Sequence, residues 1–246
     1  MKLYQANLTR GLFALGVLGA SCAALAGSIQ VSPVRVDLSS AAKVAVLTVR
    51  NTGADESVMQ VTLNKWTLDG AAYAYRSSQE LVVTPATFRL APGKQQIVRI
   101  GMSGTAPAEN EGAYRLLVEE VPPPPSPAYT QTRLVVRHDL PVFVAPAKPA
   151  HAALDVALEC SKAGGAAQLR VASVGNVHAL LRNVVLETAQ DKRVLGRWDA
   201  FDYLLPGSQK RWELAKVAPG AVGKGFVLTA ETDQGAFSAN VASACL

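Results

Sequence analysis

The chain has 246 residues, of which 49% are hydrophobic and 17% are charged, and its formal net charge is +5. Lys2 and Arg10 lie in the first ten residues, and the other basic residues are spread along the chain without a compact run. Because nucleic-acid binding needs a concentrated basic surface, often with interleaved aromatic residues, this composition argues against it.

Residues 1–26 have the pattern of a secretory signal peptide. Lys2 and Arg10 are followed by the apolar stretch GLFALGVLGA and by Ala24-Leu25-Ala26, a small-x-small cleavage pattern. The apolar stretch is too short for a stable membrane span. Cys22 lacks the upstream leucine of a lipoprotein cleavage box, which argues against lipidation. We expect an exported protein that begins near Gly27.

A first run of short alternating segments predicts one immunoglobulin-like β-sandwich over residues 27–146. Turn signals such as Asn51-Thr52-Gly53 and Ala91-Pro92-Gly93 separate the segments. The expected strands are Ile29–Val36, Val44–Arg50, Val58–Trp66, Leu81–Thr84, Gln95–Ile100, Ala113–Val121 and Thr132–Val144.

The last of these segments follows a proline-rich loop that begins at Pro122. Leu134, Val136, Leu140 and Val142 share one face at period two, so the strand offers both backbone hydrogen bonds and an apolar row. Such an edge strand is usually an aggregation hazard, and we interpret it here as a functional feature. The alternative is that the same side chains pack into the domain's own core, and apolar residues on the opposite face leave the choice of face open.

The segment Ala145–Ala150 contains two prolines and interrupts the strand pattern, so it is the predicted linker. A second run of segments predicts a second, more glycine-rich sandwich over residues 147–246. Its expected strands are Ala153–Glu159, Gln168–Ser173, Ala179–Thr188, Arg193–Trp198, Gln209–Leu214, Gly225–Glu231 and Ala236–Val241. The predicted fold class is therefore all-β with two immunoglobulin-like sandwich domains.

Two cysteines remain after the signal segment, Cys160 and Cys245, both in the second domain. In an exported protein a disulfide between them is the default expectation. It would fasten the end of the chain to the first strand of that domain. A redox or metal-binding pair is the alternative, but neither a Cys-x-x-Cys motif nor a neighbouring histidine is present.

Residues that carry chemistry are scarce in this sequence. The three histidines, His138, His151 and His178, belong to no local nucleophile or metal motif. His138 and Asp139 are adjacent on one strand, so their side chains point to opposite faces. We therefore expect no enzymatic activity, no cofactor, no metal and no small-molecule substrate.

Arginines on the expected strands are the candidate functional residues, namely Arg35, Arg99, Arg115 and Arg137. Each could simply be a solvated residue on a polar strand face. If Ala113–Val121 and Thr132–Val144 form a hairpin, however, Arg115 lies opposite His138–Pro141, close to the linker. A cation there would face the crevice between two domains, where ligand sites are frequent.

Several segments in order resemble one known family. They are IQVSPVRV at 29–36, VRN at 49–51, PATFRLAPGKQQIVR at 85–99, YRLLVEEVP at 114–122, LPVFVAP at 140–146, GNVH at 175–178 and LLPG at 204–207. In this order and spacing they resemble the periplasmic chaperones of the chaperone–usher pilus pathway, the PapD-like family, in its archaic, spore-coat-U-like branch.

The resemblance implies an L-shaped periplasmic protein that binds pilus subunits and delivers them to an outer-membrane usher. Such a chaperone donates its long edge strand to a subunit that lacks its final strand. The positions implied for this donor strand are Thr132, Leu134, Val136, His138 and Leu140, and we favour the face of Leu134, Val136 and His138.

The resemblance also implies that basic residues in the cleft hold the subunit's C-terminal carboxylate. Arg35 matches the family's arginine on the first strand, but Pro141 stands where its lysine is expected. Arg115 is our candidate replacement, because a carboxylate needs a second charge-assisted partner, and Arg137 is the fallback. Ala145 likewise replaces the family's interdomain arginine.

A structural pilus subunit or adhesin with tandem β-sandwiches is the alternative function. Subunits of that kind carry an extra N-terminal donor segment and lack the seventh strand of their own sandwich. The first domain here has a full set of expected strands, which favours the chaperone.

Overall fold

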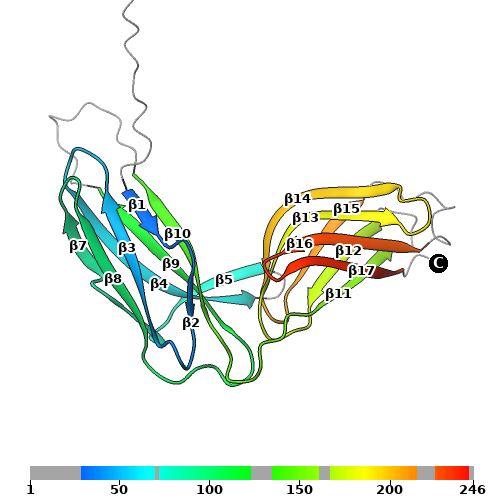
Figure 1. Cartoon of the computed structure of the whole chain (residues 1–246), viewed down its shortest axis with the longest axis horizontal. Helices are drawn as coiled ribbons and strands as arrows, with labels where there is room; N and C mark the ends of the chain where they lie inside the picture. The colour runs from blue at the N-terminus through cyan, green and yellow to red at the C-terminus, as the bar shows by residue number, and fades with distance from the viewer. Residues whose placement is uncertain (1–28, 70–71, 123–134, 161–166, 215–224, 244–246) are drawn as a thin grey trace, which may run out of the picture.

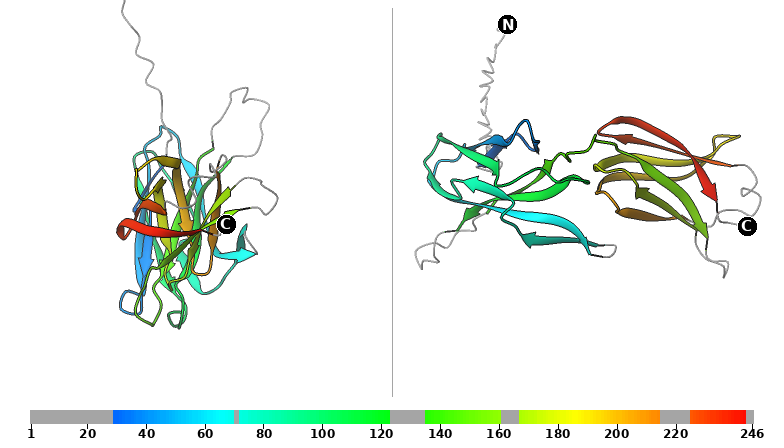
Figure 2. Two further views of the ribbon diagram at one scale, coloured as in Figure 1. Left: turned by 90° about the vertical axis from the view of Figure 1, so that its right-hand side faces the viewer. Right: turned by 90° about the horizontal axis from the view of Figure 1, so that it is seen from below.

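The chain folds into two β domains joined by a bend, in a computed structural model that describes residues 29–69, 72–122, 135–160, 167–214 and 225–243 (Figure 1). No described residue is helical, and thus no described helix could span a membrane. The right-hand view of Figure 2 shows the two domains lying end to end. The predicted all-β fold with two sandwich domains is confirmed.

The first domain consists of two sheets that pack over one apolar core. The first sheet has the order β1-β3-β8-β6 and the second the order β2-β10-β9-β4-β5, with β7 also paired to β4. The strands are β1 (Ile29–Ser32), β2 (Val36–Leu38), β3 (Val44–Asn51), β4 (Ser57–Asp69), β5 (Ala72–Ser77), β6 (Leu81–Thr84), β7 (Thr87–Leu90), β8 (Gln95–Met102), β9 (Gly112–Val121) and β10 (Arg137–Val144).

The predicted first strand, Ile29–Val36, is wrong as one continuous element. Pro33 has no N–H to donate, and the chain leaves the ladder there: β1 pairs with β3 in one sheet, whereas β2 pairs with β10 in the other. Arg35 consequently lies in the bend between the two short strands and not on a strand. This bend brings Arg35 close to the end of β10.

Two strands of the first domain were not predicted, β5 and β7. β5 carries the sequence AYAYRS and has no fully buried residue, so it lacks the buried apolar face from which a strand is predicted. It forms a hairpin with β4, and Figure 1 shows this hairpin reaching toward the second domain. β4 itself runs three residues past the predicted end at Trp66.

The second domain is a sandwich whose strands follow one path, β14-β13-β16-β17-β11-β12-β15. All seven predicted strands are present, and the fourth is longer than predicted. The strands are β11 (Leu154–Cys160), β12 (Ala167–Ser173), β13 (Ala179–Thr188), β14 (Val194–Leu204), β15 (Gln209–Leu214), β16 (Phe226–Thr232) and β17 (Gly235–Ser243). The boundary predicted at residue 146 falls in the connection between β10 and β11.

The predicted disulfide falls outside the described residues at Cys245 and stays a prediction. Of the strands that lead to these cysteines, β11 and β17 are parallel neighbours, with Leu158 opposite Ser243.

Three apolar clusters stabilise this arrangement. One fills each sandwich, and the third lies where the domains meet, formed by Trp66, Ala113, Phe143 and Leu205 with Tyr203 packed against them. Burial of each large side chain contributes about 1.5–3 kcal/mol, so the third cluster holds the two domains against each other.

Candidate functional site

Aromatic rings line the junction between the domains. Trp66 of β4 and Phe143 of β10 come from the first domain, and Tyr203 of β14 comes from the second. Tyr203 lies 5.6 Å from the Trp66 ring and 5.7 Å from the Phe143 ring, measured between centroids. Tyr73 of β5 meets the edge of Trp66 at 5.1 Å and donates a hydrogen bond to the Tyr203 carbonyl. We call the four rings the junction aromatics.

Arg115 rests on these rings from the side of β9. Its guanidinium lies 3.9 Å from the centroid of Trp66 and 5.6 Å from that of Tyr203. Nη1 is 3.6 Å from Asp139 Oδ1, which is a loose contact, and Nε is buried without a hydrogen-bond partner among the described residues. The register places Arg115 opposite Pro141 on β10, as the hairpin argument predicted. Arg115 is thus fixed mainly by rings and retains unused donors.

Arg35 approaches the same rings from the other side. Its guanidinium lies 5.0 Å from the centroid of Phe143, and its side chain is 33% exposed. Nε donates to both oxygens of Asp37, at 2.9 and 3.0 Å, and Nη1 lies 3.2 Å from Asp233 Oδ2 in the second domain. Burial lowers the pKa of Arg35, but the two carboxylates outweigh it and raise that pKa above its ordinary value.

The two arginines therefore flank one aromatic cluster. Burial raises the pKa of the Tyr203 hydroxyl, and the positive charges of Arg35 and Arg115 both oppose that rise. Both charges act on the Tyr203 ring, so Arg35 and Arg115, which were separate candidates in the sequence, lie near the same ring in the structure. Each guanidinium is a charge-assisted donor of the kind that binds a carboxylate.

Arg137 lies elsewhere. It is 63% exposed, pairs in register with Glu119 and lies 3.6 Å from Glu119 Oε1. Four residues of extended chain, about 13 Å, separate it from Pro141 at the cleft. The structure thus places the fallback residue outside the cleft.

A buried histidine next to the junction aromatics connects the two domains. His178 is 2% exposed and stacks on Phe143 with a centroid distance of 3.7 Å. Its Nδ1 is 2.6 Å from Glu111 Oε2 of the first domain, and its Nε2 is 3.1 Å from Asp233 Oδ2, although that N–H is not aligned for a hydrogen bond. Both ring nitrogens face carboxylates, which favours the doubly protonated, charged ring.

Opposing effects set the pKa values of this network. Burial alone would lower the pKa of His178, but its interactions with the carboxylates of Asp233 and Glu111 outweigh burial and raise that pKa. Burial alone would raise the pKa of Asp233, but contacts with His178, the Leu180 amide and Arg35 hold it well below its usual range. The network is therefore an ionic connection between the domains.

The second-domain motif GNVH occupies this junction. Asn176 accepts a hydrogen bond from the Glu111 amide at 2.8 Å and donates its side-chain amide to the carbonyls of Glu109 and Pro149. Gly175 must be glycine, because a Cβ there would lie 2.1 Å from the His151 carbonyl oxygen. The motif is recognisable in the sequence, but its pattern predicts no role for His178. His178 has no acidic residue nearby in the sequence, so no local motif indicated that it would pair with carboxylates.

The outer edge of β10 is only partly covered. β9 pairs with its whole length, but β2 pairs only with Val142–Val144. Among the described residues, no strand therefore pairs with Arg137–Pro141 on that side. This free edge leads directly to the two arginines.

The predicted donor positions differ in their surroundings. Leu140 is 5% exposed and packs in the first domain's core, so in this structure it stabilises its own domain, and its expected role as a donated side chain stays a prediction. His138 is partly exposed and its Nε2 is 3.0 Å from the Ile29 carbonyl oxygen. Val136 is partly exposed. Thr132 and Leu134 lie outside the described residues.

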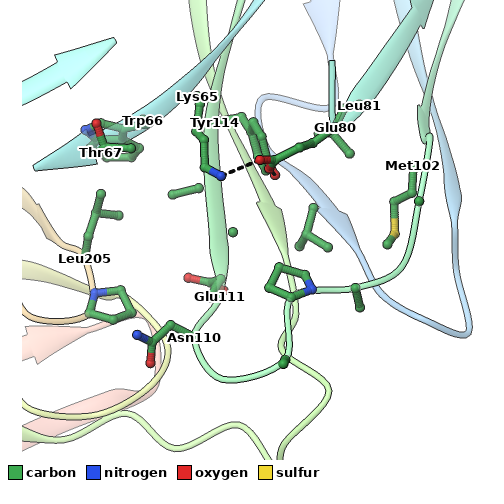
Figure 3. Close-up of a pocket in the computed structure, with 18 of the residues that line it drawn as sticks. Lys65, Trp66, Thr67, Glu80, Leu81, Met102, Asn110, Glu111, Tyr114 and Leu205 are labelled. Atoms are coloured by element: carbon green, nitrogen blue, oxygen red, sulfur yellow. Dashed lines mark hydrogen bonds and ion pairs between the residues drawn. The ribbon is translucent and has the colours of Figure 1, made fainter. Parts of the chain in front are cut away.

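A hollow of about 730 Å³ opens at the end of the first sandwich, beside Leu205 and Pro206 of the second domain (Figure 3). Lys65 Nζ lies 2.5 Å from Glu80 Oε1 there, and Tyr114 donates its hydroxyl to the other oxygen of Glu80. Burial and this hydrogen bond raise the pKa of Tyr114. The charged side chains that line the hollow are thus already paired, Lys65 with Glu80 and Glu111 with His178. No cluster of metal-ligating side chains occurs in the described part of the chain.

Known structures share this architecture. The chaperone of the CsuC–CsuE chaperone–tip adhesion subunit complex, from archaic Csu pili of Acinetobacter baumannii, has 19% sequence identity and a TM-score of 0.66; the match covers 88% of this chain and 99% of that one. The YadV chaperone matches with 19% identity and a TM-score of 0.62, covering 87% and 100%. The Salmonella enterica complex of SafA pilin with the SafB chaperone matches with 18% identity and a TM-score of 0.59, covering 87% and 96%.

A search of the curated proteins finds no match. The profile of the family described as pili and flagellar-assembly chaperone, PapD N-terminal domain, matches residues 28–150, which are 123 of the 246 residues and half of the chain. This region contains the cleft arginines and the free edge of β10. The chain therefore belongs to the PapD-like family of pilus-assembly chaperones.

Proposed function

We propose that this protein is a periplasmic chaperone that binds pilus subunits and passes them to an outer-membrane usher. The observation that carries the proposal is the free edge of β10 over Arg137–Pro141, which leads into a cleft with two arginines. Relatives of the same architecture are described as complexes with a pilin or a tip adhesion subunit. A chaperone of this kind acts by binding and has no need of a catalytic site.

The subunit would add a strand to the free edge of β10. Backbone hydrogen bonds would supply affinity, and alternate side chains would fill pockets of the subunit. Val136 is the described candidate for such a side chain, together with Leu134 and Thr132 before it. His138 is a further contact, whereas Leu140 would remain in the chaperone's core.

The C-terminal carboxylate of the subunit would bind between Arg115 and Arg35. Arg115 is the stronger candidate, because the rings of Trp66 and Tyr203 orient it while only a loose 3.6 Å contact with Asp139 engages its Nη1. An oriented guanidinium loses little entropy on forming two parallel hydrogen bonds with a carboxylate. Arg35 would supply the second contact from the opposite side.

Recovery of complexes from the periplasm tests the function. We expect one-to-one complexes with small secreted subunits, and we expect the mature chain to begin near Gly27 by N-terminal sequencing. The chaperone should be absent from assembled fibres. Detection of this chain along the fibre would instead support the alternative, a structural subunit or adhesin.

Three arginine variants test the anchor. Arg35→Ala and Arg115→Ala should each weaken subunit binding about tenfold or more, because a hydrogen bond to a charged group contributes about 1.5–3 kcal/mol. Arg137→Ala is the matched control, since it removes the same side chain outside the cleft, and it should retain nearly full recovery. Melting curves would verify that each variant is folded. Wild-type recovery with both cleft variants would exclude the anchor.

A further inference from the structure

Arg35 is already occupied by the protein's own carboxylates. Arginine presents its five N–H donors in a planar fork with two edges that can each hold a carboxylate. Asp37 takes one edge: Nε donates to it at 2.9 and 3.0 Å, and Nη2 lies 2.9 Å from Oδ1. Asp233 stands at the other side with a single contact, Nη1 to Oδ2, at 3.2 Å. A further carboxylate therefore finds no edge free.

The carboxylates of Asp37 and Asp233 differ in their exposure and in their other contacts. Asp37 lies on β2, close to Arg35 in the sequence, and its side chain is 59% exposed. Asp233 lies between β16 and β17 in the other domain and is 13% exposed. Its Oδ1 accepts a hydrogen bond from the Leu180 amide at 3.0 Å, and its Oδ2 lies 3.1 Å from His178 Nε2. Asp233 therefore connects Arg35 to the junction network.

We propose that Asp233 occupies the arginine anchor of the free chaperone and is displaced from Arg35 when the subunit's C-terminal carboxylate binds. This inference rests on the proposed function. Asp233 holds Arg35 by one contact, whereas an incoming carboxylate can form two parallel hydrogen bonds on the same edge. Asp37 keeps the other edge and the orientation of Arg35.

Displacement couples subunit binding to the junction of the domains. When Arg35 releases Asp233, the direct ionic contact of Arg35 across the cleft is lost, and the second domain is held by the His178 network and the junction aromatics. By linkage, whatever strengthens the contact between Asp233 and Arg35 weakens subunit binding by the same factor. Free and loaded chaperone would then differ in how firmly the domains are held together.

Peptide binding to three forms of the full chain tests the proposal. The probe is a synthetic peptide of alternating valine and threonine, about twelve residues long so that it can pair with β10 and reach the cleft. It is used with a free terminal carboxylate and in an amidated form. Asp233→Asn should bind the free acid at least about fivefold tighter than wild type, the lower end of typical couplings, with no gain for the amide. Equal or weaker binding would overturn the proposal.

Asp37→Asn is the matched control, because it removes the same charge beside the same arginine. It should show no gain and should weaken binding of the free acid, since Arg35 loses its orienting partner. An equal gain in both variants would overturn the proposal in favour of a general charge effect. If wild type and variants bind acid and amide alike, the carboxylate anchor itself fails, which is a distinct result.

Two measurements do not depend on the affinity of the variants. A double-mutant cycle of Arg35→Gln and Asp233→Asn on unfolding should show coupling in the free protein, and strictly additive effects would overturn the proposal whatever the peptide does. In wild type, the Leu180 amide resonance should move when the free-acid peptide binds but not with the amide. An unchanged resonance at saturation would contradict displacement.

Discussion

The two sides of the interdomain cleft hold their arginines by different physical means. On one side, Arg35 is fixed by charge, through Asp37 and the second-domain residue Asp233. On the other side, Arg115 is fixed by rings, with Trp66 at 3.9 Å and only a loose contact to Asp139 at 3.6 Å. A guanidinium that rests on a ring keeps its N–H edges for a ligand, whereas one paired with carboxylates does not.

This difference suggests that the two sides of the cleft have different roles in binding a subunit. The aromatic side is arranged for recognition, since the Trp66 ring orients Arg115 and only a loose contact with Asp139 engages its Nη1. The ionic side is arranged for communication, since Asp233 can exchange with an incoming carboxylate while Asp37 keeps the orientation of Arg35. The changes described below disturb one side at a time.

Trp66→Ala should have the largest effect, because it removes the ring beneath Arg115. Trp66 is 3% exposed, and truncation of a buried tryptophan typically costs about 3–5 kcal/mol. Chemical denaturation would measure the loss, and peptide binding should fall with it. Trp66→Phe is the control, because it keeps a ring under the guanidinium, and it should lose much less. Equal losses in both variants would mean that the ring does not orient Arg115.

His178→Gln should have a smaller effect, confined to the ionic side. A glutamine amide can donate to Glu111 or to Asp233, so one of the two side-chain contacts is kept and the other is lost. A hydrogen bond to a charged group contributes about 1.5–3 kcal/mol. The loss should appear in the free energy of unfolding, while the orientation of Arg115 is retained. Loss of peptide binding without loss of stability would contradict this assignment.

The same histidine predicts a pH dependence with a definite sign. The pKa of His178 is raised in the folded protein, so its stabilising contribution is complete below its ordinary pKa of about 6.5. That contribution is lost as the pH rises through the raised value. Wild-type stability should therefore fall from mildly acidic to alkaline pH, by no more than the loss seen in His178→Gln. In that variant the same pH range should have little effect. An equal slope in both proteins would place the titrating group elsewhere.

Much of the fold was predictable because strand periodicity is local. The strands around Leu47, Val98 and Leu116 alternate buried side chains with partly or fully exposed ones over most of their length, and the predicted segments coincide with them. The failures have local causes as well. Pro33 divides one apolar segment between two sheets without interrupting its apolar pattern, so the division could not be predicted from that pattern. β5 lacks a buried face, so it has no alternating apolar pattern that would mark it as a strand.

The site was predictable only in part, because it is built between domains. The hairpin register that places Arg115 opposite Pro141 follows from two neighbouring strands, and that prediction is confirmed. His178, Glu111 and Asp233 are far apart in the sequence and meet only when the domains pack. The hydrophobic periodicity of single strands does not predict such contacts between domains. The conflict at Pro141, where a family lysine was missing, was the available clue that this cleft is built differently.

Lysine substitutions of the two arginines should give the smallest effects and separate the two sides most finely. Arg115→Lys keeps the charge but loses the planar group that stacks on Trp66, at a cost of about 1 kcal/mol. Arg35→Lys loses the paired contact with Asp37 on a side chain that is 33% exposed, which should cost less than about 1 kcal/mol in stability. Binding of the free-acid peptide should fall more in Arg115→Lys, because a flexible ammonium must be ordered when the ligand arrives. A larger fall in Arg35→Lys would show that the charge-fixed arginine, and not the ring-fixed one, is the main anchor.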